Sequence, residues 1–270
     1  MSPESALAEL RLTTRAEHDR IEHILRLPEP MPLERYAAIA SGFDAFLRVW
    51  EPRIHAALPE RLQGWFRPRR RGGFASADVE WLRDVAGIEP TAFSTGMTAA
   101  LPLNDLAQVL GSLYVIEGSA LGGRVIAPQL KRTLGLDQGR GASYFHGFGG
   151  DTGVMWANFK VVASLEIGES SRATVRACQS AKRTFAALID LFAPLAPAQE
   201  PARPAAATPG RISPALLAAW TDDDDPDATR PAPLGDDHID LPVDDEPADG
   251  DSLVELPLDE PGDDTVRMPL

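Results

Sequence analysis

Cysteine is nearly absent from this sequence, which contains only Cys178 among its 270 residues. A single cysteine excludes an intrachain disulfide framework and any zinc site built from several cysteines. No uninterrupted apolar run of about 18 residues is present, so no membrane-spanning helix is predicted. The first residues include Glu4 and Glu9 and no apolar core segment, so we expect no signal peptide. These absences favour a cytoplasmic protein.

Positive charge is scarce in the last part of the chain. From Pro197 onward there are 19 of the 40 Asp and Glu residues, 4 of the 26 Lys and Arg residues, and 13 of the 24 prolines. The net charge of -14 therefore belongs to this segment, and the residues before it are close to neutral. Prolines remove backbone donors and like charges repel, so such a segment buries too little apolar surface to offset its ordering entropy. We predict one globular domain at residues 1–195 and an acidic, proline-rich, disordered tail at residues 196–270.

Strand-like alternation and hairpin turn signals are also missing, whereas apolar residues recur at helical spacing throughout the first 195 residues. The fold class is therefore predicted to be all-α. We expect Pro52 to kink or end the second helix, a basic loop or short helix at 62–73, and a glycine-rich loop at 146–152. The predicted helices span 5–27, 33–58, 76–86, 103–134, 153–166 and 170–195.

The first predicted helix carries a histidine at the edge of its apolar stripe. At about 100° per residue, four polar residues fall within a sector of about 60° beside that stripe. They are Arg11, Arg15, His18 and Glu22. One interpretation is a half-buried histidine among surface charges, and this is the commoner case for a single helix. The other is an axial iron ligand, because haem needs an imidazole on an apolar wall and cations for its propionates. His23 falls on the far side.

The long helix at 103–134 contains an unusual group of small residues. Gly118 and Gly122 are four residues apart and share a face with Ser119, although glycine costs about 1 kcal/mol relative to alanine inside a helix. This strip is explained equally well by close helix–helix packing, or by a helix that ends at Gly122–Gly123. The functional interpretation is a helix bent over a flat ligand, with its backbone in contact and no Cβ in the way.

Together the two segments resemble the haem oxygenase family. The pattern Leu10-Arg11-x-x-Thr14-Arg15-x-x-His18-x-x-x-Glu22 is similar to the proximal helix of that family. About 100 residues later, Glu117-Gly118-Ser119-x-Leu121-Gly122-Gly123 resembles the distal helix of its bacterial, biliverdin-producing members. A weaker similarity extends through residues 153–159 and 181–185 to about Leu195. It covers the whole predicted globular domain and none of the tail.

The resemblance implies a multi-helical bundle with haem held between a proximal helix and a kinked distal helix. It implies that His18 is the axial iron ligand, with Arg11 and Arg15 near the propionates. Glu22 could accept a hydrogen bond from the imidazole nitrogen that faces away from iron. Haem would be both substrate and cofactor, and oxygen would convert it to biliverdin, carbon monoxide and iron.

On the distal side, the resemblance implies that Gly118 and Gly122 approach the haem face. Ser119 lies where mammalian members have an aspartate that organises water, so the distal proton network would rely on water, the Ser119 hydroxyl and backbone groups. The sequence shows no distal His or Arg near Ser119. The predicted catalytic residues are therefore Gly118, Ser119 and Gly122.

Electrons must come from another protein, since the chain has no flavin or nicotinamide fingerprint. A ferredoxin, flavodoxin or reductase is the implied donor, and a phytochrome or other biliverdin acceptor is a further candidate partner. The arginines between Arg67 and Arg71 could form a docking patch for an acidic donor, although a solvated basic loop is the commoner case. Nucleic-acid binding is not expected, because aromatic residues do not accompany the patch.

Three alternatives stay open at this point. Related helical enzymes of the same superfamily act on thiamine or small cofactors without haem, but they would leave His18 and the glycine strip unexplained. A non-catalytic haem carrier or sensor would keep the same site, with the acidic tail binding a basic partner. Finally, the tail could fold back on the cluster between Arg67 and Arg71 and block the electron donor.

Overall fold

The computed structural model describes residues 3–197, and the side chains of residues 6–197. Within this range the chain forms α-helices joined by short turns and 3-10 segments, without a β-strand. The α-helices are α1 (Pro3–Leu25), α2 (Leu33–Ala57), α3 (Glu60–Phe66), α4 (Gly72–Asp84), α5 (Gly96–Ala99), α6 (Leu106–Leu134), α7 (Ser143–His146), α8 (Thr152–Ile167) and α9 (Ser171–Phe192). The 3-10 segments are η1 (Arg67–Arg69), η2 (Gly149–Asp151) and η3 (Ala193–Leu195). The all-α prediction is confirmed, and the prediction of a disordered tail concerns residues outside the described range.

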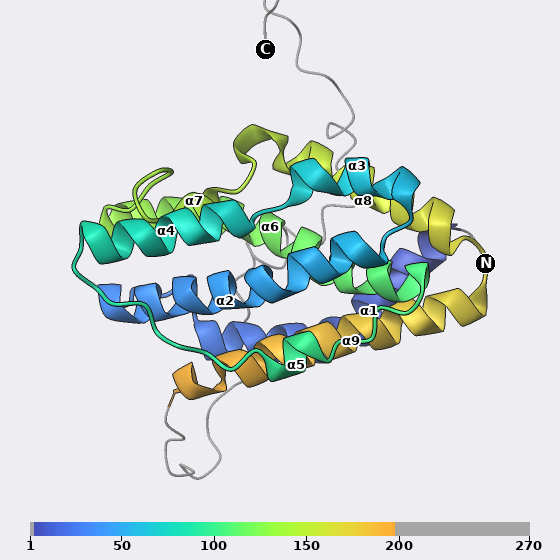
Figure 1. The fold of residues 1–270 in the computed structure, drawn as a ribbon, viewed down its shortest axis with the longest axis horizontal. Helices are drawn as coiled ribbons and strands as arrows, with labels where there is room; N and C mark the ends of the chain where they lie inside the picture. Colours follow the sequence, from blue (N-terminus) through green and yellow to red (C-terminus); the bar gives the residue numbers. More distant parts are fainter. Residues whose placement is uncertain (1–2, 198–270) are drawn as a thin grey trace, which may run out of the picture. The chain divides into compact units, whose positions relative to one another are not determined.

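Helix α6 is the central element of the bundle. It packs most extensively against α9, which also packs along α1, while α4 lies beside α2 and α8 packs on α6 (Figure 1). By length and composition α6 could cross a membrane, but 78% of its most apolar window is buried inside the fold. Its hydrophobic character therefore reflects its place in the core.

Local sequence signals set both ends of α6. The Asp105 side chain accepts a hydrogen bond from the Gln108 backbone N–H at 3.0 Å, which satisfies a donor of the first turn. At the other end Gly135 takes the left-handed conformation, with φ of 68°, and closes the helix. Between them the helix runs without a break through Gly122–Gly123, so the alternative of a helix end there is wrong.

Two glycines of α6 mark close contacts with neighbouring backbone. A Cβ on Gly111 would lie 2.0 Å from the carbonyl oxygen of Ala177 on α9. A Cβ on Gly123 would lie 2.1 Å from the carbonyl oxygen of Phe145 on α7. Both helices therefore approach α6 more closely at these two positions than any side chain would permit.

Helix α4 begins at Gly72, although Ser76 was predicted as its first residue. The Glu51 carboxylate on α2 accepts hydrogen bonds from the backbone N–H groups of Arg71 and Gly72, at 2.6 and 2.8 Å. These are donors of the first turn, so a side chain 20 residues away caps this helix. Ser76 instead donates to the Asp44 carboxylate at 2.6 Å.

A second remote carboxylate organises the segment that follows α6. Asp78 on α4 is 1% exposed and accepts hydrogen bonds from the N–H groups of Ser143 and Tyr144, at 2.7 and 2.8 Å. This interaction starts the short helix α7, whose last residue His146 begins the segment predicted as a glycine-rich loop. Elsewhere α2 continues through Pro52 to Ala57, so the helix does not end early there.

Candidate active site

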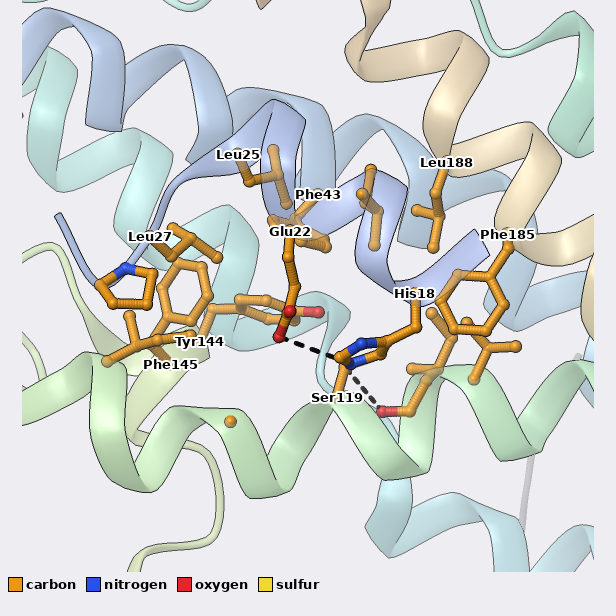
Figure 2. A pocket seen from close by; sticks show the side chains of 16 residues that line it. His18, Glu22, Leu25, Leu27, Phe43, Ser119, Tyr144, Phe145, Phe185 and Leu188 are labelled. Atoms are coloured by element: carbon orange, nitrogen blue, oxygen red, sulfur yellow. Dashed lines mark hydrogen bonds and ion pairs between the residues drawn. The ribbon is translucent and has the colours of Figure 1, made fainter. Parts of the chain in front are cut away.

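A small apolar pocket lies between α1 and α6. Its cavity volume is about 100 Å³. Helices α2, α7 and α9 close its remaining sides (Figure 2). Among the lining residues, His18, Glu22, Ser119 and Tyr144 carry polar side-chain groups. The lining residues are His18, Ile21, Glu22, Leu25, Leu27, Pro28, Phe43, Val115, Ile116, Ser119, Gly122, Ile126, Tyr144, Phe145, Phe185 and Leu188.

His18 projects from α1 into this pocket. Figure 2 shows its ring pointing across the cavity toward Ser119 on α6. The ring also makes an edge contact with Phe185 of α9, with centroids 6.1 Å apart. Burial lowers the pKa of His18 from 6.5 to about 4, and the neighbouring Asp19 carboxylate opposes the shift. The imidazole is therefore neutral at pH 7, which is the form that binds metals.

Glu22 lies one turn after His18 and faces the same cavity. Its Oε1 atom is 3.7 Å from His18 Nε2, which is beyond hydrogen-bond distance. Burial, together with the nearby charge of Asp19, raises the pKa of Glu22 to about 7. The expected hydrogen bond between Glu22 and the imidazole is therefore not formed in this geometry.

Only some of the small residues predicted on α6 line the pocket. Ser119 and Gly122 line the pocket opposite α1, whereas Gly118 is buried but does not line it. The Ser119 hydroxyl donates to the Ile116 carbonyl oxygen at 2.8 Å. Two of the three predicted α6 residues thus face His18 across the cavity.

Arg71 lies directly behind Ser119. It is 3% exposed, and its Nη2 group donates to Ser119 Oγ at 2.8 Å and to the Ile116 carbonyl oxygen. Its guanidinium also stacks 4.8 Å from the ring centre of Tyr144, another pocket residue. The prediction that no arginine lies near Ser119 is therefore wrong, because Arg71 is far from α6 in sequence but adjacent in the fold.

Arg69 is also buried, at 5% exposure, and forms an ion pair with Glu117 on α6 at 2.9 Å. It donates as well to Asn158 Oδ1 at 2.6 Å and to the Met155 carbonyl oxygen at 3.0 Å, so it joins η1 to α6 and α8. Burial raises the pKa of Glu117 to about 6 even though Arg69 and Arg71 oppose the shift. The prediction of a surface patch between Arg67 and Arg71 is therefore wrong for Arg69 and Arg71, because both are buried.

The two arginines predicted beside the propionates do not line the pocket. Arg15 is exposed and Arg11 is half-buried on α1, on the same side of the helix as His18. His23 is exposed, as expected for the far side of that helix. The structure therefore brings together His18, Glu22, Ser119 and Gly122, and leaves Arg11, Arg15 and Gly118 outside the cavity.

The aromatic residues that line the pocket were not predicted from the sequence as part of the site. Phe43 of α2 stacks on Tyr144 of α7, with ring centres 4.7 Å apart, and Phe145 and Phe185 complete this wall. Phe43 matched the helical period and Phe185 belonged to a weakly similar segment, but neither pattern indicates which cavity a side chain enters. Only the packing of α2, α7 and α9 around α6 places them together.

The fold and the site together define an all-α protein with one neutral imidazole facing a small-residue strip across an apolar pocket. Residues 96–194 match the family model described as heme oxygenase. The bundle is similar to heme oxygenase from Neisseria meningitidis, solved with NO and CO bound, with a TM-score of 0.53 and 22% identity over 70% of this chain and 92% of that chain. No curated protein matches the sequence. Residues 96–194 are therefore similar to the heme oxygenase family, and the structural likeness supports the fold of the bundle.

The residues present fit haem by their chemistry. A neutral imidazole on an apolar wall is a suitable axial ligand, and the opposite wall is built from the small residues Ser119 and Gly122. The cavity of about 100 Å³ is nevertheless small beside the roughly 300–1,000 Å³ of typical ligand sites. Haem binding therefore requires α1 and α6, or their side chains, to move apart.

Proposed function

We propose that this protein opens haem to biliverdin, carbon monoxide and iron, with His18 as the axial iron ligand. The observation that carries this proposal is the His18 imidazole, which faces Ser119 and Gly122 across an apolar pocket. Bound haem would supply the redox iron at which oxygen is reduced. We further propose that the enzyme works in the cytoplasm.

The proximal side depends on the protonation state of His18. Because burial holds its pKa near 4, the ring nitrogen keeps its lone pair throughout the physiological range. Glu22 lies 3.7 Å from Nε2 and can accept a hydrogen bond from the imidazole after a small rotation of either side chain. This contact would fix the ring orientation and strengthen its basicity.

The distal side depends on Ser119 and on the arginine behind it. Arg71 donates to Ser119 Oγ, so the hydroxyl is held in place and its own proton points to the Ile116 carbonyl oxygen. Gly122 keeps the neighbouring part of the wall free of bulk. We assign the positioning of water and protons on this side to Ser119, with Arg71 as a buried positive charge that supports it.

Electrons would come from a ferredoxin, a flavodoxin or a reductase, and a phytochrome-type protein could accept the biliverdin. The structure gives little support to docking at the arginine cluster, since Arg69 and Arg71 are buried and only Arg67 and Arg70 are exposed. The buried Arg69 and Arg71 are therefore not part of the donor surface.

The test adds haemin to the purified full-length chain, records the Soret band, and then supplies ascorbate or a reductase in air. We expect a histidine-ligated Soret band that bleaches as biliverdin absorbance and carbon monoxide appear. His18→Ala should lose this ligation, whereas His23→Ala on the exposed side of α1 should match the wild type. An unchanged Soret band in His18→Ala would overturn the ligand assignment.

The same experiment separates the alternatives. A stable haem complex that never yields biliverdin would favour a non-catalytic carrier or sensor. The absence of any Soret complex would favour the relatives that act without haem. Both results would contradict the proposed activity while leaving the all-α fold unchanged.

A further inference from the structure

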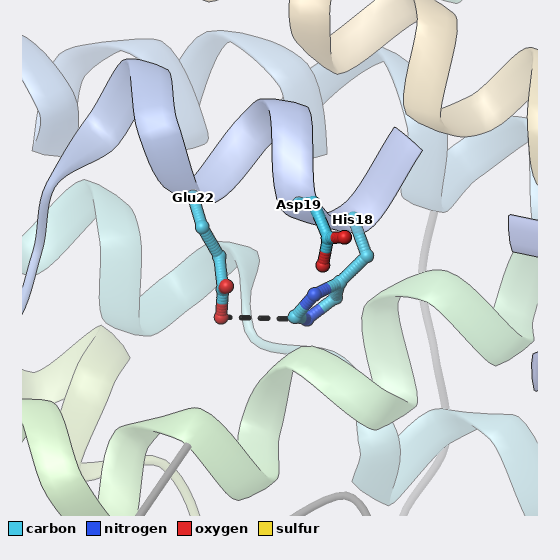
Figure 3. Close-up of side chains that lie close together, drawn as sticks. All are labelled: His18, Asp19 and Glu22. Atoms are coloured by element: carbon cyan, nitrogen blue, oxygen red, sulfur yellow. Dashed lines mark ion pairs between the residues drawn. The ribbon is translucent and has the colours of Figure 1, made fainter. Parts of the chain in front are cut away.

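We propose that the haem-free protein has a site for a divalent transition-metal ion at His18, Asp19 and Glu22. This site differs from the axial ligation of haem, because two carboxylates take part and no porphyrin is needed. The ligand atoms of the three side chains lie within 4.8 Å of one another on α1 (Figure 3).

Helical geometry brings the three donors to one side of α1. His18 and Glu22 are four residues apart and Asp19 and Glu22 three apart, so both pairs are neighbours on the helix surface. Two ligands that bind one ion at about 2.1 Å lie at most about 4.2 Å apart. The 3.7 Å between His18 Nε2 and Glu22 Oε1 already satisfies this limit. Asp19 needs only a small change of its side-chain torsions to join them.

The charge of the cluster also favours a cation. Among residues 6–197, neither Asp19 nor Glu22 forms an ion pair with a lysine or arginine, although Glu22 is partly buried. Glu22 faces the apolar pocket, where an uncompensated carboxylate is costly. A divalent ion would supply the missing positive charge and would find one imidazole and two carboxylate ligands, a set suited to Fe²⁺, Co²⁺ or Zn²⁺.

The site suggests a use for the iron that leaves an opened macrocycle. The released ion would move to the Nε2 side of His18, where the carboxylates of Asp19 and Glu22 could bind it before it leaves. This use rests on the proposed function, whereas the existence of the cation site does not. Haem and a free ion would compete for His18, so only one of them is bound at a time.

Co²⁺ is a suitable probe, and the test uses the full chain without haem. Calorimetric titration should show one site in the wild type that is weakened at least tenfold in Asp19→Asn and lost in His18→Ala. Glu9→Gln removes the same charge from an exposed position of α1 outside the cluster and should behave as the wild type. The acidic segment after Pro197 is the same in every variant, so its background binding cancels.

Two further readouts make the result decisive. Haemin should displace Co²⁺ from the wild type, and the haem titration of Asp19→Asn should be unchanged because Asp19 does not line the pocket. Equal Co²⁺ affinity in the wild type, Asp19→Asn and His18→Ala would overturn the site. Because the Co²⁺ titration contains no haem and no oxygen chemistry, its failure is distinct from a failure of biliverdin formation.

Discussion

Arg71 donates a hydrogen bond of 2.8 Å to the hydroxyl of Ser119, and it does so from a position only 3% exposed to solvent. The same guanidinium binds the Ile116 carbonyl oxygen and stacks on Tyr144. One buried cation therefore supports the α6 wall of the pocket and the aromatic wall from α7. Hydrogen bonds to charged groups contribute about 1.5–3 kcal/mol each, so this contact has consequences for both stability and the site.

Arg71→Met should bind haem nearly as the wild type does, because His18 is on the opposite wall. Its turnover should fall at least tenfold, since Ser119 loses the donor that holds its oxygen in place. Haem affinity and single-turnover rates measured separately will distinguish the two effects. Arg67→Met, at an exposed arginine four residues earlier, is the matched control. Equal turnover in the two variants would show that Arg71 has no part in the distal side.

The Arg69–Glu117 pair makes a stability prediction. Arg69→Met leaves Glu117 buried without its ion-pair partner, so unfolding should cost about 3–5 kcal/mol less than in the wild type. The double variant Arg69→Met with Glu117→Leu removes both charges and should recover much of this loss. Urea unfolding of both variants at pH 7 is the measurement. A double variant as unstable as the single one would mean that lost packing, and not the unpaired charge of Glu117, causes most of the loss in stability.

The cluster between Arg67 and Arg71 also bears on the acidic segment. If that segment blocked an electron donor there, removing it would raise the donor's affinity at low salt. Since Arg69 and Arg71 are buried and Arg70 is paired with Glu51 at 3.1 Å, we expect truncation after Leu195 to change neither turnover nor donor affinity. A rise in donor affinity that disappears at high salt would restore the blocking hypothesis.

The sequence predicted the two walls of the pocket because the signals involved are local. Helical periodicity gave α1 and α6, and the imidazole and the small residues were recognisable at their own positions, as His18, Ser119 and Gly122 show. The start of α4 and the helix α7 could not be predicted in this way. Their backbone donors are satisfied by Glu51 and Asp78, which are distant in sequence.

Burial of the arginines was unpredictable for the same reason. A run of basic residues beside glycines usually remains solvated, and nothing local distinguishes Arg69 and Arg71 from Arg67 and Arg70. The difference comes from Glu117 and Ser119, which α6 brings to this segment from about 48 residues away. Such pairings are properties of the assembled bundle.

Replacement of glycine by alanine should have opposite effects on stability at Gly111 and at Gly64. Gly111→Ala places a Cβ 2.0 Å from the Ala177 carbonyl oxygen, so backbone must shift and stability should fall by about 1–3 kcal/mol or more. Gly64→Ala, inside α3 with no atom within 4 Å of the new Cβ, should gain about 0.5–1 kcal/mol. Denaturant unfolding of the two variants decides this, and equal stability would contradict the close approach.

The raised pKa of Glu22 predicts how its replacement depends on pH. The carboxyl group has a pKa of about 7 in the folded protein against 4.5 when exposed, so the folded state binds more protons between these values. Its contribution to stability is therefore present in full below pH 4.5 and is lost as pH rises to 7. Glutamine does not titrate, so Glu22→Gln does not lose this stability as the pH rises. The melting temperature of the variant minus that of the wild type should therefore increase between pH 5 and pH 8. Glu9→Gln, exposed on the same helix, should show a constant difference over this range. A constant difference for Glu22→Gln as well would mean that this carboxyl group titrates as it does in water.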